Sequence, residues 1–308
     1  MPLPRAHDKN TRELCRYRQL DVQRKGVKNM HVPVDRLTEL AEDLAARAAH
    51  LIWTDRLPAA ARRRVEGLRG TATTISPAGL GAERLIRELL AEYRPSDAVL
   101  GHTAVTPGQV TWVVDALNGN ANYLSGLPSY SVSVAAMLDD VVLAAAVVEP
   151  HSRRTWSAGL GQGARLHDRM ISDSWLELGV SSTERLDVAV VSTGFSTTAA
   201  TRVIGALLPH IGDIRCSGSP ALDLVHVAAG WTDAHVDRGV SLRERAAGLL
   251  IAEEAGATVC QPGLDGVVLA SASRIFDALL QVLDRGAAAE AEAGTSLTLT
   301  AVRPRRTA

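Results

Sequence analysis

The sequence lacks features that define several classes of protein. Its three cysteines, Cys15, Cys216 and Cys260, cannot close a disulfide framework, which indicates a reducing compartment. No run of about 20 apolar residues could span a bilayer, and the N-terminus has no apolar signal-peptide core. Lys plus Arg number 33 against 34 Asp plus Glu, so no overall positive charge points to nucleic acid or an anionic membrane. We therefore expect a cytoplasmic protein that binds neither nucleic acid nor a membrane.

The 308 residues otherwise have the composition of a folded protein, 46% hydrophobic and 22% charged. Residues 1–29 differ from the rest, because they contain eight Lys or Arg and three acids with little apolar periodicity. This composition predicts a basic, disordered arm. No aromatic residues alternate with its charges as stacking platforms for bases would, which argues against a nucleic-acid-binding arm.

Apolar spacing predicts helices and then strands in residues 30–183. An apolar stripe predicts a helix over 34–54 and consists of Val34, Leu37, Ala41, Leu44, Ala48 and Leu51. A second helix is expected over 80–93, closed by Pro95. Short β-branched or alternating segments predict strands at 110–115, 132–138, 141–148 and 155–158. The second and third of these strands flank Asp139–Asp140, so we expect a hairpin there.

Residues 184–286 instead alternate between strand and helix, which is typical of an α/β sheet with helical cover. Strands are expected at 188–192, 214–216, 232–236 and 267–270, and helices at 201–208, 220–230, 244–256 and 274–283. The change of pattern near residue 183 predicts a domain boundary. The Ala/Glu/Thr-rich residues 287–308 are expected to form a flexible tail.

The glycine-rich run at 159–163 (GLGQG) resembles a nucleotide-binding loop only superficially. Its spacing is not G-x-G-x-x-G, and no helix with an acidic residue about 20 positions later follows it. Glycines after a strand are more simply explained by a turn that needs positive φ. We therefore interpret this run as a turn.

Three segments carry a resemblance to a known family. Residues 112–123 read WVVDALNGNANY, residues 215–237 read RCSGSPALDLVHVAAGWTDAHVD, and residues 243–257 read RERAAGLLIAEEAGA. They resemble the motifs W-[IV]-[IV]-D-P-[IL]-D-G-T-x-N-[FY], R-x-x-G-S-A-A-L-D-L-x-x-V-A-A-G-x-x-D-x-x-x-E and W-D-x-A-A-G-x-L-I-x-E-A-G-G of the inositol monophosphatase family. The resemblance covers about residues 34–285. It implies a layered α/β/α/β/α fold, a homodimer, and Mg²⁺-dependent hydrolysis of phosphate monoesters at a site between the two domains.

The resemblance also implies roles for individual positions. The metal positions are Asp115, shared between ions; Leu117, through its carbonyl; Asn118, in place of a second loop acid; His102, in place of a glutamate; and Glu244, in place of an aspartate. Asn120 replaces the catalytic threonine, and Gly79 replaces the acid that pairs with it. The substrate side is implied to include Gly119, Asn120, Ser219, Pro220 and Asp237.

Most of the acids that the family uses are missing here. Positions 79, 102, 103, 115, 118 and 244 are acidic in the family, whereas here only Asp115 and Glu244 are. Mg²⁺ prefers oxygen ligands and several carboxylates, so two or three ions would bind poorly. Without them, the site would lose both its activated water and the stabilisation of its leaving group.

Three hypotheses follow from this loss. The first is an inactive or severely weakened member that binds a phosphorylated or polyol ligand or pairs with an active relative. In this hypothesis, Arg243 either supplies positive charge or pairs with Glu244. The second is an active phosphatase with a rebuilt one-metal site that uses His102, Asp115 and Glu244, with help from Asn118. Since imidazole favours Zn²⁺ over Mg²⁺, its metal would differ. The third is a nucleic-acid-binding or interaction protein that works through the basic arm.

Overall fold

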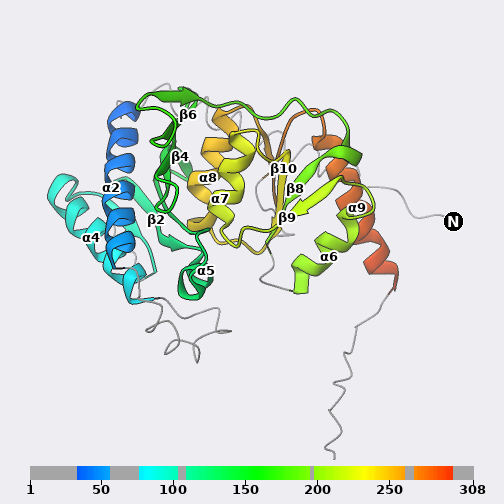
Figure 1. Cartoon of the computed structure of the whole chain (residues 1–308), viewed down its shortest axis with the longest axis horizontal. Coiled ribbons are helices and arrows are strands. Elements are labelled where there is room, and N and C mark those ends of the chain that lie inside the picture. Colours follow the sequence, from blue (N-terminus) through cyan, green and yellow to red (C-terminus); the bar gives the residue numbers. More distant parts are fainter. Residues whose placement is uncertain (1–32, 56–75, 103–108, 195–197, 261–266, 294–308) are drawn as a thin grey trace, which may run out of the picture.

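Helices and sheets alternate in layers in the computed structural model, which describes residues 33–55, 76–102, 109–194, 198–260 and 267–293. Helices α2 and α4 cover one face of a large sheet, and α7 and α8 lie between that sheet and a smaller one. Helices α6 and α9 form the outermost layer on the other side (Figure 1). This confirms the expected αβαβα architecture. The basic arm and Thr103 lie outside the described residues.

The large sheet has the strand order β1-β2-β3-β4-β5-β6-β7 within the described residues, with β1 parallel to β2 and the other pairs antiparallel. Its strands are β1 (Ala98–Leu100), β2 (Thr111–Asn118), β3 (Ser131–Leu138), β4 (Val141–Glu149), β5 (Arg154–Gly159), β6 (Ala164–Asp168) and β7 (Trp175–Glu177). The predicted hairpin is β3–β4, and both Asp139 and Asp140 adopt positive φ in its turn. Two positive φ values match the twist of a tight hairpin, and aspartate tolerates them well.

The smaller sheet has the order β11-β12-β10-β8-β9, in which β8 runs parallel to both β9 and β10. Its strands are β8 (Val190–Ser192), β9 (Asp213–Arg215), β10 (Ala234–Arg238), β11 (Thr258–Cys260) and β12 (Val267–Ser271), and a 3₁₀ helix η2 (Leu186–Val188) precedes them. The boundary predicted near residue 183 falls in the extended connection between β7 and η2.

The helices pack through small side chains. They are α2 (Val34–Thr54), α4 (Pro77–Tyr93), α5 (Asn120–Ser125), α6 (Thr198–Leu207), α7 (Pro220–Ala228), α8 (Leu242–Glu254) and α9 (Phe276–Ala293). Leu37, Ala41 and Leu44 of α2 are buried as the stripe predicted. In the middle layer, a Cβ on Gly248 of α8 would lie 2.7 Å from the Cβ of Leu224 on α7, so glycine permits this close approach.

Sequence analysis missed or misplaced several elements. Strands β1, β6, β7 and β11 are short, and every residue of β7 is exposed, so they lack the apolar pattern that reveals a strand. Helix α9 continues to Ala293, into the segment expected to be a flexible tail, because alanine and glutamate favour helix. None of the described helices is both long and apolar enough to cross a membrane.

Candidate functional site

The C-terminal end of β2 holds the two polar side chains that the loop motif singled out. Asp115 and Asn118 are both buried, and Nδ2 of Asn118 donates a hydrogen bond to Oδ2 of Asp115 over 2.8 Å. Burial raises the pKa of Asp115, and the hydrogen bond from Asn118 opposes that rise by favouring the carboxylate. The Asn118 amide therefore helps to stabilise the ionised carboxylate of Asp115, as a nearby positive charge would.

The orientation of Asn118 follows from the start of α7. Its Oδ1 accepts hydrogen bonds from the backbone N–H of Ala221, at 3.1 Å, and from the hydroxyl of Ser219, at 2.5 Å. A backbone N–H can only donate, so Oδ1 must face α7 and Nδ2 must face Asp115. The oxygen of Asn118 is thereby turned away from Asp115. It is not presented as a second metal ligand beside that carboxylate.

His102 lies on the other side of Asp115. Its Nε2 is 3.9 Å from Oδ1 of Asp115, and its Nδ1 is 3.4 Å from Oε2 of Glu83 on α4. The backbone N–H of His102 also donates to Oε2 of Glu83 over 2.8 Å. Oδ1 of Asp115 is buried and has no hydrogen-bond partner among the described residues. His102 therefore lies between Asp115 and a buried acid, Glu83, that sequence analysis did not include.

Asn120 and Gly79 meet at the beginning of α4. Oδ1 of Asn120 accepts the backbone N–H of Ser76 over 3.1 Å, and the hydroxyl of Ser76 accepts the N–H of Gly79, also over 3.1 Å. Ser76 is the N-cap of α4 and Pro77 follows it, which is a common way to start a helix. The structure thus places these two positions together around Ser76, although asparagine and glycine supply neither an acid nor a hydroxyl.

Gly119 and helix α5 lie against the loop before α7, which Asn122 of α5 contacts directly. Gly119 has φ of +87°, and a Cβ there would come within 2.9 Å of the carbonyl oxygen of Ser129. Asn122 donates through Nδ2 to the carbonyls of Ser129 and Ser217, at 2.6 and 2.7 Å. Ser219 is fully buried, and Pro220 is the first residue of α7. The implied substrate positions of the two loops therefore lie side by side.

A group of acids extends from Asp115 toward the smaller sheet. Burial, together with the negative charge of Glu244, raises the pKa of Asp237 on β10 to about 6. Burial, together with the negative charge of Asp237, raises the pKa of Asp223 on α7 to about 7. Glu244 lies at the start of α8, where its Oε2 accepts the backbone N–H of Ser241 over 2.8 Å. Its carboxylate is therefore partly committed to capping a helix.

The donors present do not fit the two or three Mg²⁺ ions that the resemblance implies. Among the described residues, no three His, Cys, Asp or Glu side chains converge closely enough to hold a metal ion. Leu117 packs into the core with its side chain, as expected for a position that offers only a carbonyl. The hydrogen bond from Asn118 occupies one oxygen of Asp115. The residues present therefore do not provide the oxygen ligands that hydrolysis with Mg²⁺ requires.

Glu83, Ser76 and Asp223 are the polar residues of this region that sequence analysis missed. Glu83 left a recognisable signal, because it follows Gly79 and precedes Ile86 on the buried face of α4, where a charge is unusual. Arg87 pairs with it at 2.9 Å. Asp223 likewise sits within the apolar run of α7.

Other reactive side chains do not join the site as nucleophiles. Burial raises the pKa of the Cys216 thiol, which disfavours the reactive thiolate. His226 contacts the ring of Trp231, at 5.2 Å between centroids. His235 is fully buried on β10, where Nδ1 is 3.0 Å from the hydroxyl of Ser192. Their pKa values are lowered by burial, to about 4 for His226 and about 3 for His235, so both are neutral packing residues.

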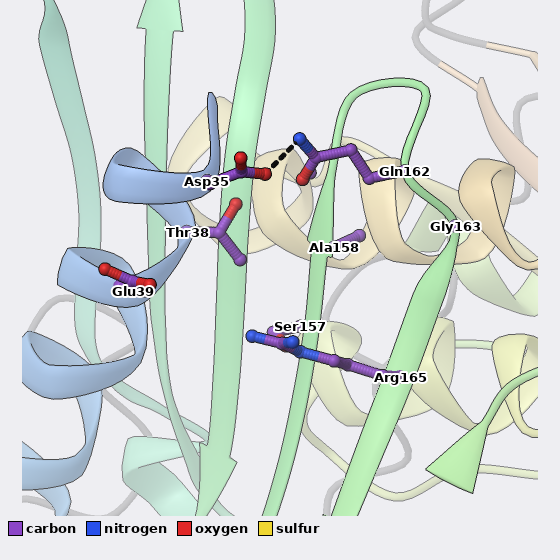
Figure 2. Close-up of a pocket in the computed structure, with 9 residues that line it drawn as sticks. Asp35, Thr38, Glu39, Ser157, Ala158, Gln162, Gly163 and Arg165 are labelled. Atoms are coloured by element: carbon purple, nitrogen blue, oxygen red, sulfur yellow. Dashed lines mark hydrogen bonds between the residues drawn. The ribbon is translucent and has the colours of Figure 1, made fainter. Parts of the chain in front are cut away.

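A polar pocket of about 290 Å³ lies elsewhere, between the start of α2 and the β5–β6 hairpin (Figure 2). Gln162 reaches across to hydrogen-bond Asp35, and Arg165 lies near Ser157 on the pocket wall. The candidate site is near the opposite end of α2, because Tyr123 of α5 donates to the carbonyl of Asp55 over 3.2 Å. A helix of this length spans about 30 Å, so the pocket is separate from the site.

The same hairpin contains the glycine-rich run. Gly161 and Gly163 have positive φ, which confirms that the run is a turn. Their backbone N–H groups donate to the two carboxylate oxygens of Glu254, at 2.8 Å each. These contacts fasten the hairpin to the end of α8.

The Asn118–Asp115 contact leads to a testable prediction. In Asn118→Asp, an oxygen would replace the donor that lies 2.8 Å from Asp115, and two carboxylates would compete for one proton. We expect the free energy of unfolding to fall by about 2 kcal/mol at pH 7.5. The shared proton raises the folded-state pKa of the pair, so the loss should shrink toward pH 4.5. Urea unfolding at both pH values measures it, and an equal loss at both would contradict the argument.

Comparison with known proteins agrees with the layered fold. The model of the inositol monophosphatase family matches residues 34–296. An inositol-1-monophosphatase from Mycobacterium leprae is 38% identical over 272 residues, which cover 80% of this chain and 90% of that protein. The structure of Mycobacterium tuberculosis SuhB superposes with a TM-score of 0.70 at 36% identity and covers 82% of this chain and 97% of that one.

A solved structure with lower sequence identity has the same fold. The inositol monophosphatase of Thermotoga maritima superposes with a TM-score of 0.72 at 25% identity, over 83% of this chain and 99% of that chain. These matches span nearly the whole length of the relatives. The similarity therefore extends across both sheets of the fold.

Proposed function

This chain belongs to the inositol monophosphatase family, and we propose that it is a member whose phosphomonoesterase activity is impaired or lost, and whose site binds a small phosphorylated ligand. The family match covers both the motif at the end of β2 and the motif at the start of α7. The fold is therefore retained, while the acids that would bind metal are replaced. The proposal concerns what this altered site can still do.

One observation carries the proposal: the hydrogen bond from Asn118 to Asp115. At a position where the resemblance implies an acid that shares a metal with Asp115, this chain has an amide that contacts Asp115 directly. A carboxylate in that position would repel Asp115 unless a cation lay between them. The Asn118 amide does not repel the Asp115 carboxylate, so the site needs a bound cation much less. The site is therefore arranged to be stable without Mg²⁺.

Loss of the metal would remove most of the catalysis. Metal ions in such a reaction activate the attacking water and stabilise the leaving oxygen, and electrostatic stabilisation of this kind is usually the largest contribution to the rate. Asn120 cannot replace a hydroxyl in helping the water, because its Oδ1 already accepts the N–H of Ser76. Cys216 does not supply another nucleophile, because burial raises the pKa of its thiol.

The site keeps more of the groups that ligand binding needs than of the groups that hydrolysis needs. The two loops of the implied substrate side remain fastened together by Asn122. Asp237, with a pKa of about 6, can accept hydrogen bonds from the hydroxyls of a polyol when it is ionised and donate when it is protonated. Nη1 of Arg243 is buried and has no hydrogen-bond partner among the described residues, so its guanidinium is a candidate group for an anionic phosphate.

Phosphate release by the purified protein tests the proposal. Inositol, sugar and nucleotide phosphates would each be offered with Mg²⁺, Mn²⁺ and Zn²⁺ in turn, beside the Asp115→Asn variant. We expect no rate above that of the variant with any metal, while the same phosphates raise the thermal unfolding temperature by binding the folded state. Metal-dependent turnover above the variant would overturn the proposal and favour the active one-metal hypothesis. Absence of any ligand-induced shift would overturn its binding half.

A further inference from the structure

The polar pocket beside the start of α2 interrupts an interface that is otherwise apolar. Leu37 and Ala41 of α2 belong to the apolar cluster that this helix forms with β3 and β4. At the pocket, α2 and β5 instead contribute Thr38 and Ser157, which are 5% and 0% exposed. Burial of a hydroxyl group is unfavourable unless it is hydrogen-bonded, so these surfaces favour a polar ligand.

Ser157 on the pocket wall keeps a hydrogen-bond donor that the protein does not use. Its Oγ accepts a hydrogen bond from Nε of Arg165 over 3.2 Å, and its hydroxyl proton has no acceptor among the described residues. Because a hydroxyl can donate one hydrogen bond while it accepts another, this proton is available to a ligand. The ligand should therefore carry an acceptor, such as a hydroxyl oxygen.

Arg165 does not make the pocket an anion site, because its guanidinium is already paired. The side chain extends across β5 toward α2 (Figure 2), where Nη2 lies 2.8 Å from Oε1 of Glu42. The same guanidinium lies over the ring of Trp175, with Cζ 4.4 Å from the ring centroid. An acid and an aromatic ring thus stabilise this positive charge, and little of it remains for a bound anion.

The acids of the pocket leave negative charge available. Asp35 and Glu39, one turn apart on α2, both line the pocket and are exposed. Asp35 accepts a hydrogen bond from Nε2 of Gln162 but forms no ion pair among the described residues. Glu39 pairs with Arg36 at 3.1 Å, and an exposed pair of this kind is weak. A positively charged ligand group is therefore favoured beside these two carboxylates.

The hairpin that forms the opposite wall of the pocket is held in place. The backbone N–H groups of Gly161 and Gly163 donate to Glu254 at the end of α8. A Cβ on Gly159 would lie 2.2 Å from the side-chain oxygen of Gln162, so glycine at this position lets Gln162 lie across the strand and reach α2. A wall that is already formed reduces the ordering that binding would otherwise cost.

We propose that this pocket binds a small polyol that carries a protonated amine, as an amino sugar does. The ammonium group lies beside the carboxylates of Asp35 and Glu39, and a hydroxyl oxygen accepts the proton of Ser157. The volume of about 290 Å³ is near the lower end of the range for ligand pockets and suits a molecule of monosaccharide size. Because the pocket is separate from the candidate site, this binding is independent of the proposed function.

Calorimetric titration of the full chain with glucosamine at about pH 6, where the amine is protonated, tests the inference. Glucose is the matched ligand, because it has a hydroxyl in place of the amine and no charge. We expect glucosamine to bind with a dissociation constant below about 1 mM, at least about 10-fold more tightly than glucose. Asp35→Asn should weaken glucosamine binding about 10-fold, and Ser157→Ala should weaken it about 5-fold.

The matched control variant is Asp43→Asn. It removes a carboxylate from the same helix outside the pocket, where Asp43 pairs with Arg47 at 2.9 Å, and it should bind glucosamine like the parent. Asp35 is exposed, so Asp35→Asn should fold, and thermal unfolding monitored by circular dichroism checks this for every variant.

Any of four results would overturn the inference: no binding of glucosamine, equally tight binding of glucose, unchanged affinity in Asp35→Asn, or an equal loss of affinity in Asp43→Asn. The outcome is distinguishable from that of the proposed function. Asp35→Asn should leave the shift in thermal unfolding temperature caused by phosphorylated ligands unchanged, because those ligands bind near the opposite end of α2. Failure of either proposal therefore leaves the other standing.

Discussion

Phosphate release should rise at least about 10³-fold, and become dependent on Mg²⁺, when the missing groups of the site are restored. The variant would combine the following substitutions: Gly79→Asp, His102→Glu, Thr103→Glu, Asn118→Asp and Asn120→Thr. The physical reason is that the scaffold is retained, whereas the charges that attract the ions are not. Four added carboxylates would also make Mg²⁺ a stabilising ligand of the folded protein.

The measurement is initial-rate phosphate release from an inositol phosphate with and without Mg²⁺, beside the parent chain. Asp115→Asn in the restored background serves as the control and should return the rate to the parent level. A restored variant that leaves Asn118 unchanged should remain inactive, because its amide would still occupy Oδ2 of Asp115. If the parent chain released phosphate as fast as the restored variant, the replaced residues would not explain a loss of activity.

Relative to the Asp223→Asn variant, the parent should lose about 2–4 kcal/mol of unfolding free energy as the pH rises from about 4 to 8; the opposite pH effect of the buried His226 and His235 is common to both proteins and cancels in this comparison. Burial raises the pKa of Asp223 from 3.8 to about 7 and that of Asp237 from 3.8 to about 6. Each acid therefore keeps its proton in the folded state over a range in which the unfolded state has lost it. The resulting stabilisation is complete below the unfolded pKa and is lost as the pH passes the folded pKa.

Urea unfolding at intervals across this range measures the slope. Asp223→Asn replaces the acid by an amide that does not titrate, so its stability relative to the parent should increase from pH 4 to 8. Asp213→Asn is the matched control, because Asp213 is exposed on β9 and this variant should keep the pH dependence of the parent between pH 5 and 8. A difference in unfolding free energy between the parent and Asp223→Asn that stays constant from pH 4 to 8 would contradict the argument.

Much of the fold could be predicted from the sequence because its apolar pattern is regular. The alternation around Asp139–Asp140 predicted the β3–β4 hairpin, and the spacing of Leu37, Ala41 and Leu44 predicted the buried face of α2. The short strands were missed because three to five residues contain too little periodicity to separate a strand from a loop. β7, exposed along its length, illustrates this.

The residues of the candidate site could be named from the sequence, but their interactions could not. Asn118 could be identified as a replaced acid, whereas the direction of its amide depends on Ala221, which lies about a hundred positions later. Likewise, His102 could be identified as a replaced glutamate, but the acid behind it comes from α4. Contacts between distant segments decide which atoms face the site, and a local pattern does not contain them.

The middle layer has a consequence for how the protein unfolds. Helices α7 and α8 bury side chains against both sheets, so that one apolar cluster includes Val113 and Ala135 of the large sheet together with Val268 and Ala270 of the small one. Neither sheet can lose these helices without exposing its inner face to water. The two sheets should therefore melt in a single cooperative transition, and a fragment that ends near residue 183 would have the strands of the large sheet without half of its cover.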